Sequence, residues 1–416
     1  MKKLFALFAL VGLVAAVTGC DTTSKQSRNA VGLYSIGDYT AAANVLAPEA
    51  QKKDEHFVLN NLRYGSAALA AGQLENAENA FLAAYEVMNG VKTNDGGRTM
   101  GAVLVFEGVK VWKGEPFERA MAHYYLGLVY LIKNDYENAR AAFQNSVFKL
   151  RDYAEDAKKE GGADKFTAAE SSFALGYYGL GLCNLRLNKL ELADQNFELA
   201  VKYDPRLKQL VEDTKKPGTN TLVFVDYGSG PRREARGWYN EESVFGPTPA
   251  QEGPLPPVVV TANGQTLNFD KGRYATTDTL ALAQEGKWQD IDTIRKTKAV
   301  IGTGMMAAGT GVAAYALSQG DSGTALVGLG ILAAGALVSA SSQADTRSWE
   351  MLPRTVYVVP ATLPPGEQEI TVQVGGATPQ TLKANLHSGT KNGAKADNVL
   401  YFRVLAPHAN YRPVQK

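Results

Sequence analysis

Cysteine and histidine are scarce in this chain. Its 416 residues include only two cysteines, Cys20 and Cys183, and four histidines. The two cysteines lie in very different sequence settings, so we expect no disulfide bond between them. The histidines show no metal-ligand spacing among themselves or with Cys183, and we predict no metal site and no cofactor. These histidines are His56, His123, His387 and His408.

An excess of either charge is also lacking. Lys and Arg number 43 against 42 Asp and Glu, which gives a net charge of +1. Nucleic-acid binding requires a concentrated basic face, so we predict no nucleic-acid partner. The chain is 45% hydrophobic and 20% charged, as in globular proteins, and its length indicates two or three domains.

Catalytic motifs are missing as well. The sequence contains no HExxH motif and no serine in a strand–turn–helix setting. The segment 228–231 is rich in glycine but lacks the lysine of a phosphate-binding loop, and it is predicted to be a turn. Acidic residues occur mainly on helix faces, where solvation explains them. We predict a protein that is not an enzyme, with an envelope hydrolase as an alternative, because two carboxylates need only meet in space.

The N-terminus has the pattern of an export signal. Lys2 and Lys3 precede an apolar run at 4–17, which is followed by Val-Thr-Gly-Cys at 17–20. The cysteine at this place resembles the lipobox of bacterial lipoproteins. That resemblance implies that Cys20 is lipidated through its thiol and becomes the mature N-terminus.

The lipobox resemblance also predicts a location. Residues 1–19 would be cleaved and residues 20–28 would form a tether, so the protein would be anchored to a membrane and face the periplasm of the cell envelope. Asp21 resembles the signal that retains some lipoproteins in the inner membrane. The choice between the inner and the outer membrane stays open.

Residues 29–216 carry a helical repeat, which is clearest at 121–205. An aromatic residue recurs in the second helix of each unit, and alanine precedes it by four positions. Glycine recurs in the first helix. The recurring residues are Phe81, Phe143 and Phe197 with Leu46 as a degenerate first member, Ala42, Ala77, Ala139 and Ala193, and Gly65, Gly127 and Gly181. The alanines allow two helices to approach closely, and the aromatics are expected to fill the space between successive hairpins. This pattern, closed by Pro205, resembles the tetratricopeptide repeat.

The resemblance implies an interaction surface. First helices line the concave face of such arrays, so Tyr124, Tyr178 and Arg186 are expected there as partner-binding residues for an envelope protein or peptide. The later repeat intervals exceed the period of about 34 residues, which predicts insertions at 89–115 and 152–166. The first insertion is either an extra packed segment or a lid over the groove, and we favour the lid. The second is expected to be a solvated helix extension or loop.

The C-terminal half predicts strands. Runs of β-branched and aromatic residues at 221–225, 355–359, 370–374 and 399–405 indicate strands. The runs at 258–261 and 266–269 flank Asn263-Gly264, which is a strong hairpin signal. We expect an α+β protein whose small β-sandwich or barrel is divided into 217–287, with a proline-rich linker at 247–257, and 346–416.

Between these parts, residues 288–345 have an unusual composition. An amphipathic helix is predicted at 288–298, and the chain then carries no charge from 299 to 344 except Asp321. Glycine inside helices is costly, so its abundance here indicates close helix packing in a hairpin that turns near Asp321. The expected packing residues are Gly304, Ala308, Gly311, Gly330 and Ala334. The hairpin could span a membrane, dip into it, or pack against protein, including copies of itself.

Together these features resemble an uncharacterised family of bacterial envelope lipoproteins, a resemblance that includes Asp-Thr-Arg-Ser-Trp-Glu-Met-Leu-Pro at 345–353. The sequence thus predicts a membrane-anchored scaffold or adaptor in an envelope complex. The alternative is an oligomerising subunit of a secretion, export or pore complex that assembles through its hairpin. A homo-oligomer is compatible with either prediction.

Overall fold

The computed structural model describes residues 23–89, 111–159, 172–236, 242–247, 253–267, 274–284, 305–340, 346–388, 390–391, 394–395 and 397–407. The chain divides into two compact units. The larger comprises 23–232, 247–285 and 348–416, and the smaller comprises 1–22, 233–246 and 286–347. The favoured lid lies mostly, and the amphipathic helix at 288–298 wholly, outside the described residues. Of the predicted tether, residues 25–28 belong to helix α2 (Lys25–Ser35).

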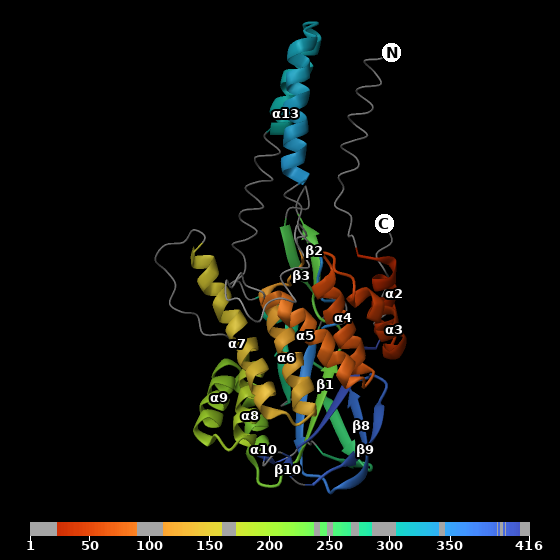
Figure 1. The fold of residues 1–416 in the computed structure, drawn as a ribbon, viewed down its shortest axis with the longest axis vertical. Helices are drawn as coiled ribbons and strands as arrows, with labels where there is room; N and C mark the ends of the chain where they lie inside the picture. The colour runs from red at the N-terminus through yellow and green to blue at the C-terminus, as the bar shows by residue number, and fades with distance from the viewer. Residues whose placement is uncertain are drawn as a thin grey trace. The chain divides into compact units, whose positions relative to one another are not determined.

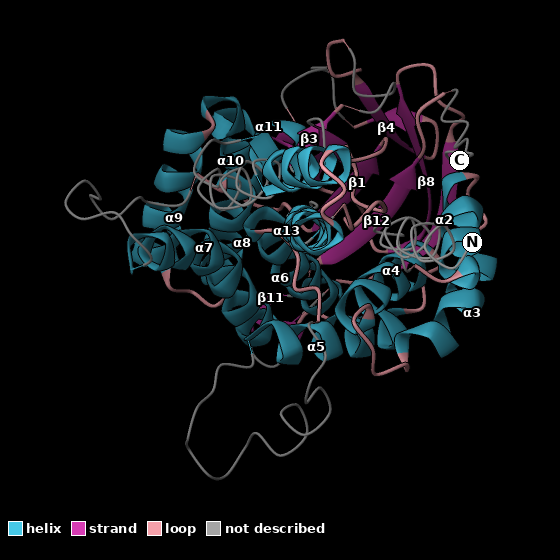
Figure 2. Ribbon diagram, turned by 90° about the horizontal axis from the view of Figure 1, so that it is seen from above, coloured by secondary structure: helices cyan, strands magenta, loops and turns pink. Residues whose placement is uncertain are grey.

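The larger unit begins with four helical hairpins, as the repeat pattern predicts. Successive helices lie side by side in chain order and curve around strands of the same unit (Figures 1 and 2). A short 3-10 turn, η2, and helix α10 follow the last hairpin. The helices are α2 (Lys25–Ser35), α3 (Tyr39–Ala50), α4 (Phe57–Ala70), α5 (Leu74–Asn89), α6 (Pro116–Ile132), α7 (Tyr136–Lys159), α8 (Ala174–Arg186), α9 (Leu190–Tyr203), η2 (Pro205–Leu207) and α10 (Lys208–Lys215). Helix α7 extends into the second predicted insertion.

The recurring glycines and aromatics contact each other within each hairpin. A Cβ atom added to Gly65, Gly127 or Gly181 would lie 2.7, 2.8 or 2.6 Å from the ring of Phe81, Phe143 or Phe197, respectively. Each aromatic therefore packs directly on the backbone of the first helix of its own hairpin. The ring of Phe143 also lies against Gly179 of the next hairpin, so it joins neighbouring repeats.

In each hairpin, the turn between the two helices has a residue with left-handed backbone conformation at the equivalent position. Gly37, Gly72, Asn134 and Asn188 have φ values of 89°, 74°, 56° and 57°. Glycine and asparagine are the residues that adopt this conformation most easily, and it ends one helix before the next begins. The sequence pattern therefore fixes both the close contacts and the turns of the array.

Strands after residue 220 form two four-stranded sheets in the larger unit. The first has the order β12-β1-β7-β6, in which β1 pairs parallel with β12 and antiparallel with β7. The second has the order β5-β4-β8-β9 and is antiparallel. Their bounds are β1 (Thr221–Tyr227), β4 (Val258–Ala262), β5 (Gln265–Thr266), β6 (Ala275–Asp278), β7 (Thr355–Ala361), β8 (Gly366–Val374), β9 (Gln380–Leu386) and β12 (Asn398–Val404).

The remaining elements are short or belong to the smaller unit. In the larger unit, α11 (Thr279–Gln284) follows β6, and β10 (Thr390–Lys391) pairs with β11 (Ala394–Lys395). Strands β2 (Arg232–Arg236) and β3 (Glu242–Gly246) form a separate pair. The smaller unit also holds a helical hairpin, in which residues 305–318 are followed by α13 (Ser322–Ala340). Helical repeats followed by sheets confirm the α+β class.

Candidate functional site: the inner face of the repeats

The predicted partner-binding residues lie inside the larger unit. Tyr124 of α6 and Tyr178 of α8 are each only 1% exposed. The Arg186 side chain, at the end of α8, is 7% exposed. All three come from first helices of the hairpins, as the repeat pattern predicts. Their surroundings, however, are other parts of the same chain.

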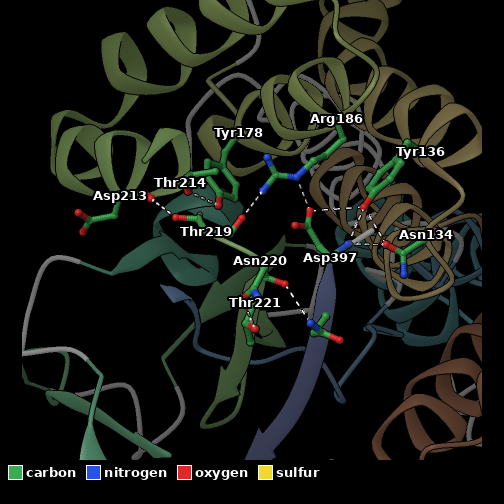
Figure 3. A network of polar contacts seen from close by, with 11 residues as sticks. Asn134, Tyr136, Tyr178, Arg186, Asp213, Thr214, Thr219, Asn220, Thr221 and Asp397 are labelled. Atoms are coloured by element: carbon green, nitrogen blue, oxygen red, sulfur yellow. Dashed lines mark hydrogen bonds and ion pairs between the residues drawn. The ribbon is translucent and has the colours of Figure 1, made fainter. Parts of the chain in front are cut away.

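Arg186 is paired with Asp397, which directly precedes β12. Its Nε atom lies 2.5 Å from Asp397 Oδ2 (Figure 3), and the Asp397 side chain is fully buried. The Asp397 backbone N–H donates to Asn134 Oδ1 at 2.8 Å and to the Tyr136 hydroxyl at 3.0 Å. The turn between α6 and α7 and the end of α8 thus hold the start of β12.

Tyr178 binds the helix that follows the repeats. Its hydroxyl lies 2.9 Å from Thr214 Oγ1 in α10 (Figure 3). Because the Thr214 hydroxyl donates to the carbonyl oxygen of Leu210 at 2.8 Å, Tyr178 is the donor in this pair. Burial raises the pKa of Tyr178, which keeps its hydroxyl protonated for this role.

A buried aspartate joins the repeats to the first sheet. Asp226 of β1 is 1% exposed, and its Oδ2 atom accepts from the hydroxyls of Tyr125 at 2.5 Å and Tyr401 at 2.8 Å. Burial raises the pKa of Asp226 to about 6, against the opposing influence of Arg403 and of the two tyrosine hydrogen bonds. Arg403 itself donates to the Tyr34 hydroxyl at 2.8 Å and to the Gly228 carbonyl oxygen at 2.5 Å.

The segment before β7 packs against another part of the inner face, which is the side of the array formed by the first helices α4, α6 and α8. Trp349 is 1% exposed and packs against the rings of Phe81 and Tyr125, with centroid distances of 6.2 and 5.6 Å. Its backbone N–H donates to Glu118 Oε1 at 2.7 Å, and its indole N–H donates to Ser66 Oγ at 3.0 Å.

Glu350 continues this contact with a charge pair. Its two carboxylate oxygens accept from Nε of Arg63 at 3.0 Å and from Nη2 at 2.5 Å. The Arg63 side chain is 2% exposed, so without Glu350 the guanidinium group would be left buried without a counter-charge. The predicted 345–353 motif thus contributes Trp349 and Glu350 to the inner face of α4 and α6.

These contacts correct the prediction of an open groove lined by Tyr124, Tyr178 and Arg186. The inner face is covered by β1, β12, α10 and residues 348–353 of the same chain, because the C-terminal half supplies both apolar side chains and complementary charges. Four charged residues that make these contacts were not predicted from the sequence: Arg63, Asp226, Glu350 and Asp397. A charged residue within an otherwise buried helix or strand, as at Arg63 and Asp226, was the available signal.

Other predicted residues have simpler surroundings. Cys183 is fully buried, and burial raises the pKa of its thiol. His56 and His123 are buried and His387 is exposed. In the described part of the chain, no group of three or more His, Cys, Asp or Glu side chains could hold a metal ion. Cys20 and His408 lie outside the described residues.

A pocket of about 400 Å³ opens on the larger unit beside the α2–α3 turn. It lies between this turn, the β8–β9 turn and the residues after β12. Ile36, which lines it, is 72% exposed. At its base the Tyr39 hydroxyl and the Gln380 amide both donate to the Arg403 carbonyl oxygen, at 2.9 and 2.7 Å.

In the smaller unit, the packing of the hairpin differs from the predicted set. A Cβ atom added to Gly309 would collide with the backbone at Leu332 and Gly328, and one added to Gly328 would collide with Ala313. Gly311 and Gly330 face open space, with nothing within 4 Å of an added Cβ. The contact stripe is therefore offset from the predicted one, and Ala308 is exposed.

The other two predicted packing residues of the hairpin are Ala334 and Gly304. Ala334 is half-buried, while Gly304 lies outside the described residues. Among the helices that the structure describes, none combines the length and the apolar character needed to cross a membrane.

Comparison with known proteins supports the repeats. Residues 174–207 match the sequence model of the tetratricopeptide repeat family. No curated protein matches the chain. Among solved structures, the crystal structure of MamA is similar over 44% of this chain and 77% of its own, with 14% identity and a TM-score of 0.30. At that TM-score the likeness carries no argument about function.

Proposed function

We propose that this protein is a lipid-anchored scaffold of the bacterial cell envelope that binds another envelope protein. The observation that carries this proposal is the array of four hairpins with tetratricopeptide character. Such arrays are interaction scaffolds that present a fixed surface to a partner. Here the array and the two sheets form one compact unit, which suits a surface of fixed shape.

The partner surface is proposed to lie outside the filled inner face. The pocket beside the α2–α3 turn is the best candidate, because it combines a volume of about 400 Å³ with an exposed isoleucine at its edge. The polar groups at its base already bind the Arg403 carbonyl oxygen. The exposed Ile36 side chain at the edge would contact an apolar side chain of a partner segment, and the polar lining residues Thr378 and Gln380 would face its backbone or polar groups.

The lipid on Cys20 is the second part of the proposal. Several acyl chains hold a protein far more firmly than one, since each buried methylene contributes about 0.8 kcal/mol. Anchoring confines the scaffold and its partner to a thin layer, which raises their effective concentration without new contacts. We propose periplasmic exposure, with the choice of membrane undecided.

Site-specific photocrosslinking in intact envelopes tests this proposal. A photoreactive residue replaces Ile36 at the pocket, and a matched variant carries it at Leu190, which is 54% exposed on α9. We expect a discrete adduct from position 36, a much weaker one from position 190, and loss of the adduct when Cys20→Ala removes the lipid attachment point. Equal adduct yields with and without Cys20 would contradict tethering, and no adduct at position 36 would contradict the pocket.

The alternative function is an oligomerising subunit of an envelope secretion, export or pore complex. Exposed apolar side chains on the hairpin favour it: Tyr315 and Leu326 are each 70% exposed. Light scattering in detergent would compare the full chain with a variant lacking 299–344. A multimer that becomes monomeric on deletion would support this alternative, and a full chain that is already monomeric would contradict it.

A further inference from the structure

The hairpin of the smaller unit has an unusual distribution of apolar side chains. Its two arms, residues 305–318 and α13, touch along a narrow stripe that includes Gly309 and Gly328. Large apolar side chains elsewhere on both arms are exposed. They are Val312, Tyr315, Leu317, Leu326 and Val327.

The large apolar side chains of the first arm are not confined to one stripe, and no side of this arm carries a charge. Successive residues of a helix are about 100° apart, so buried Gly309, Ala313 and Ala316 share one face. Val312 and Leu317 then fall on opposite flanks of that face, and Tyr315 falls beyond Val312. The remaining side carries small residues and the hydroxyls of Thr310 and Ser318, which donate to backbone carbonyl oxygens of the same helix at 2.8 and 2.6 Å. A second copy or a grooved partner would cover one stripe, whereas a helix that is apolar all round requires an apolar environment on all sides.

The scarcity of charged residues in the hairpin also favours an apolar environment. Asp321 is the only charged residue among the described residues 305–340. Its carboxylate already accepts hydrogen bonds from the backbone N–H groups of Gly323 and Thr324, at 3.0 and 3.1 Å, and from the Thr324 hydroxyl. In the sequence, the hairpin is preceded by Arg295, Lys296 and Lys298 and followed by Asp345 and Arg347, so basic residues outnumber the acidic one at its base. Basic residues next to an apolar segment complement an anionic lipid surface.

We propose that the exposed apolar side chains of this hairpin insert into an anionic lipid bilayer. The hairpin is then a second membrane contact, separate from the lipid on Cys20. This inference rests on the proposed function only for bringing the chain to a membrane. An assay with added vesicles supplies the membrane directly, so failure of lipidation and failure of hairpin insertion give different results.

The test places a fluorescent probe on the full chain. In a Cys20→Ser background, with Cys183 buried, Tyr315→Cys is labelled with an environment-sensitive dye. The matched control is Ile36→Cys, because Ile36 and Tyr315 have almost equal exposure, 72% and 70%. Each protein is mixed with vesicles of phosphatidylcholine and phosphatidylglycerol that carry a quencher on the acyl chains. The N-terminal apolar run is present in both proteins and contributes equally.

We expect a blue shift and strong acyl-chain quenching for the probe at position 315, and neither for the probe at position 36. Leu326→Glu in the labelled protein should reduce the quenching several-fold, whereas Leu382→Glu on β9 should leave it unchanged. No quenching at position 315 would overturn the proposal. A blue shift that is present without vesicles and insensitive to the quencher would also overturn it, in favour of a second copy of the chain.

Discussion

At the scale of single residues, Asp226 has a chemically unusual position in the larger unit. Two tyrosine hydroxyls donate to one of its carboxylate oxygens, and the other oxygen has no hydrogen-bond partner among the described residues. Burial without an ion pair to the carboxylate disfavours the charged form. The raised pKa of about 6 means that the folded state binds a proton more tightly than the unfolded state.

Stability should therefore depend on pH through this residue. Its contribution is fully present below the ordinary aspartate pKa and is lost as the pH rises through about 6. We expect Asp226→Asn to remove up to ~3 kcal/mol of pH-dependent change in the free energy of unfolding between pH 4 and pH 8, since one pKa unit corresponds to about 1.4 kcal/mol. Urea titrations at several pH values measure this. Asp194→Asn, at an exposed residue, is the control, and identical pH slopes for wild type and Asp226→Asn would contradict the prediction.

The glycines of the first helices act at the same scale. Gly181→Ala places a methyl group 2.6 Å from the Phe197 ring, and we expect a loss of about 1–3 kcal/mol of stability. Gly32→Ala in α2 meets nothing within 4 Å and should be neutral or stabilising by up to ~1 kcal/mol. Thermal unfolding of both variants checks the pair. Equal effects would mean that the aromatic–glycine contact does not constrain the array.

These residue-scale contacts are the part of the fold that the sequence predicts best. Glycine, alanine and phenylalanine recur at fixed helical positions because each contact is made within one hairpin or between neighbours. The hydrogen-bond partners of Asp226 could not be predicted in the same way. Its partner Tyr125 lies 101 positions away, and no local pattern brings the two together.

At the scale of elements, a strand is predictable from the sequence where its side chains have a typical strand composition. The runs that form β1, β4, β7, β8 and β12 are rich in β-branched or aromatic residues, and each has several buried side chains. The sequence Gln-Thr-Leu-Lys-Ala-Asn-Leu of β9 carries little of that signal, because most of its side chains are exposed at the edge of the second sheet. Its place in the sheet comes from pairing with β8.

The helical hairpin gives a prediction at this scale. Gly309→Ala should separate the two arms, because the added methyl group would meet backbone atoms that cannot rotate away. Gly311→Ala is the matched control, two residues away in open space. Hydrogen exchange across 305–340 should be faster in the first variant and unchanged in the second. Equal exchange in both would place the contact stripe elsewhere.

At the scale of the whole molecule, the repeats bind their own C-terminal half. The contacts that establish this join residues far apart in the sequence: Arg63 and Glu350 are 287 positions apart, and Arg186 and Asp397 are 211 apart. Sequence periodicity reports which face of a helix is buried but not what covers it. The repeat pattern therefore predicts a partner on the inner face, although the chain itself supplies the strands and charges that cover it.

The most direct test of this self-occupied inner face is a double-mutant cycle on Arg186 and Asp397. The pair is buried and its nitrogen–oxygen distance is 2.5 Å, so removing either partner leaves an uncompensated charge at a cost of about 3–5 kcal/mol. The exposed pair Lys189 and Glu137, at 3.0 Å, is the control, with an expected coupling below ~1 kcal/mol. For Arg186→Ala, Asp397→Ala and the double variant we predict a coupling of ~2 kcal/mol or more from urea unfolding. Additive effects would contradict it and would leave the inner face open to a partner.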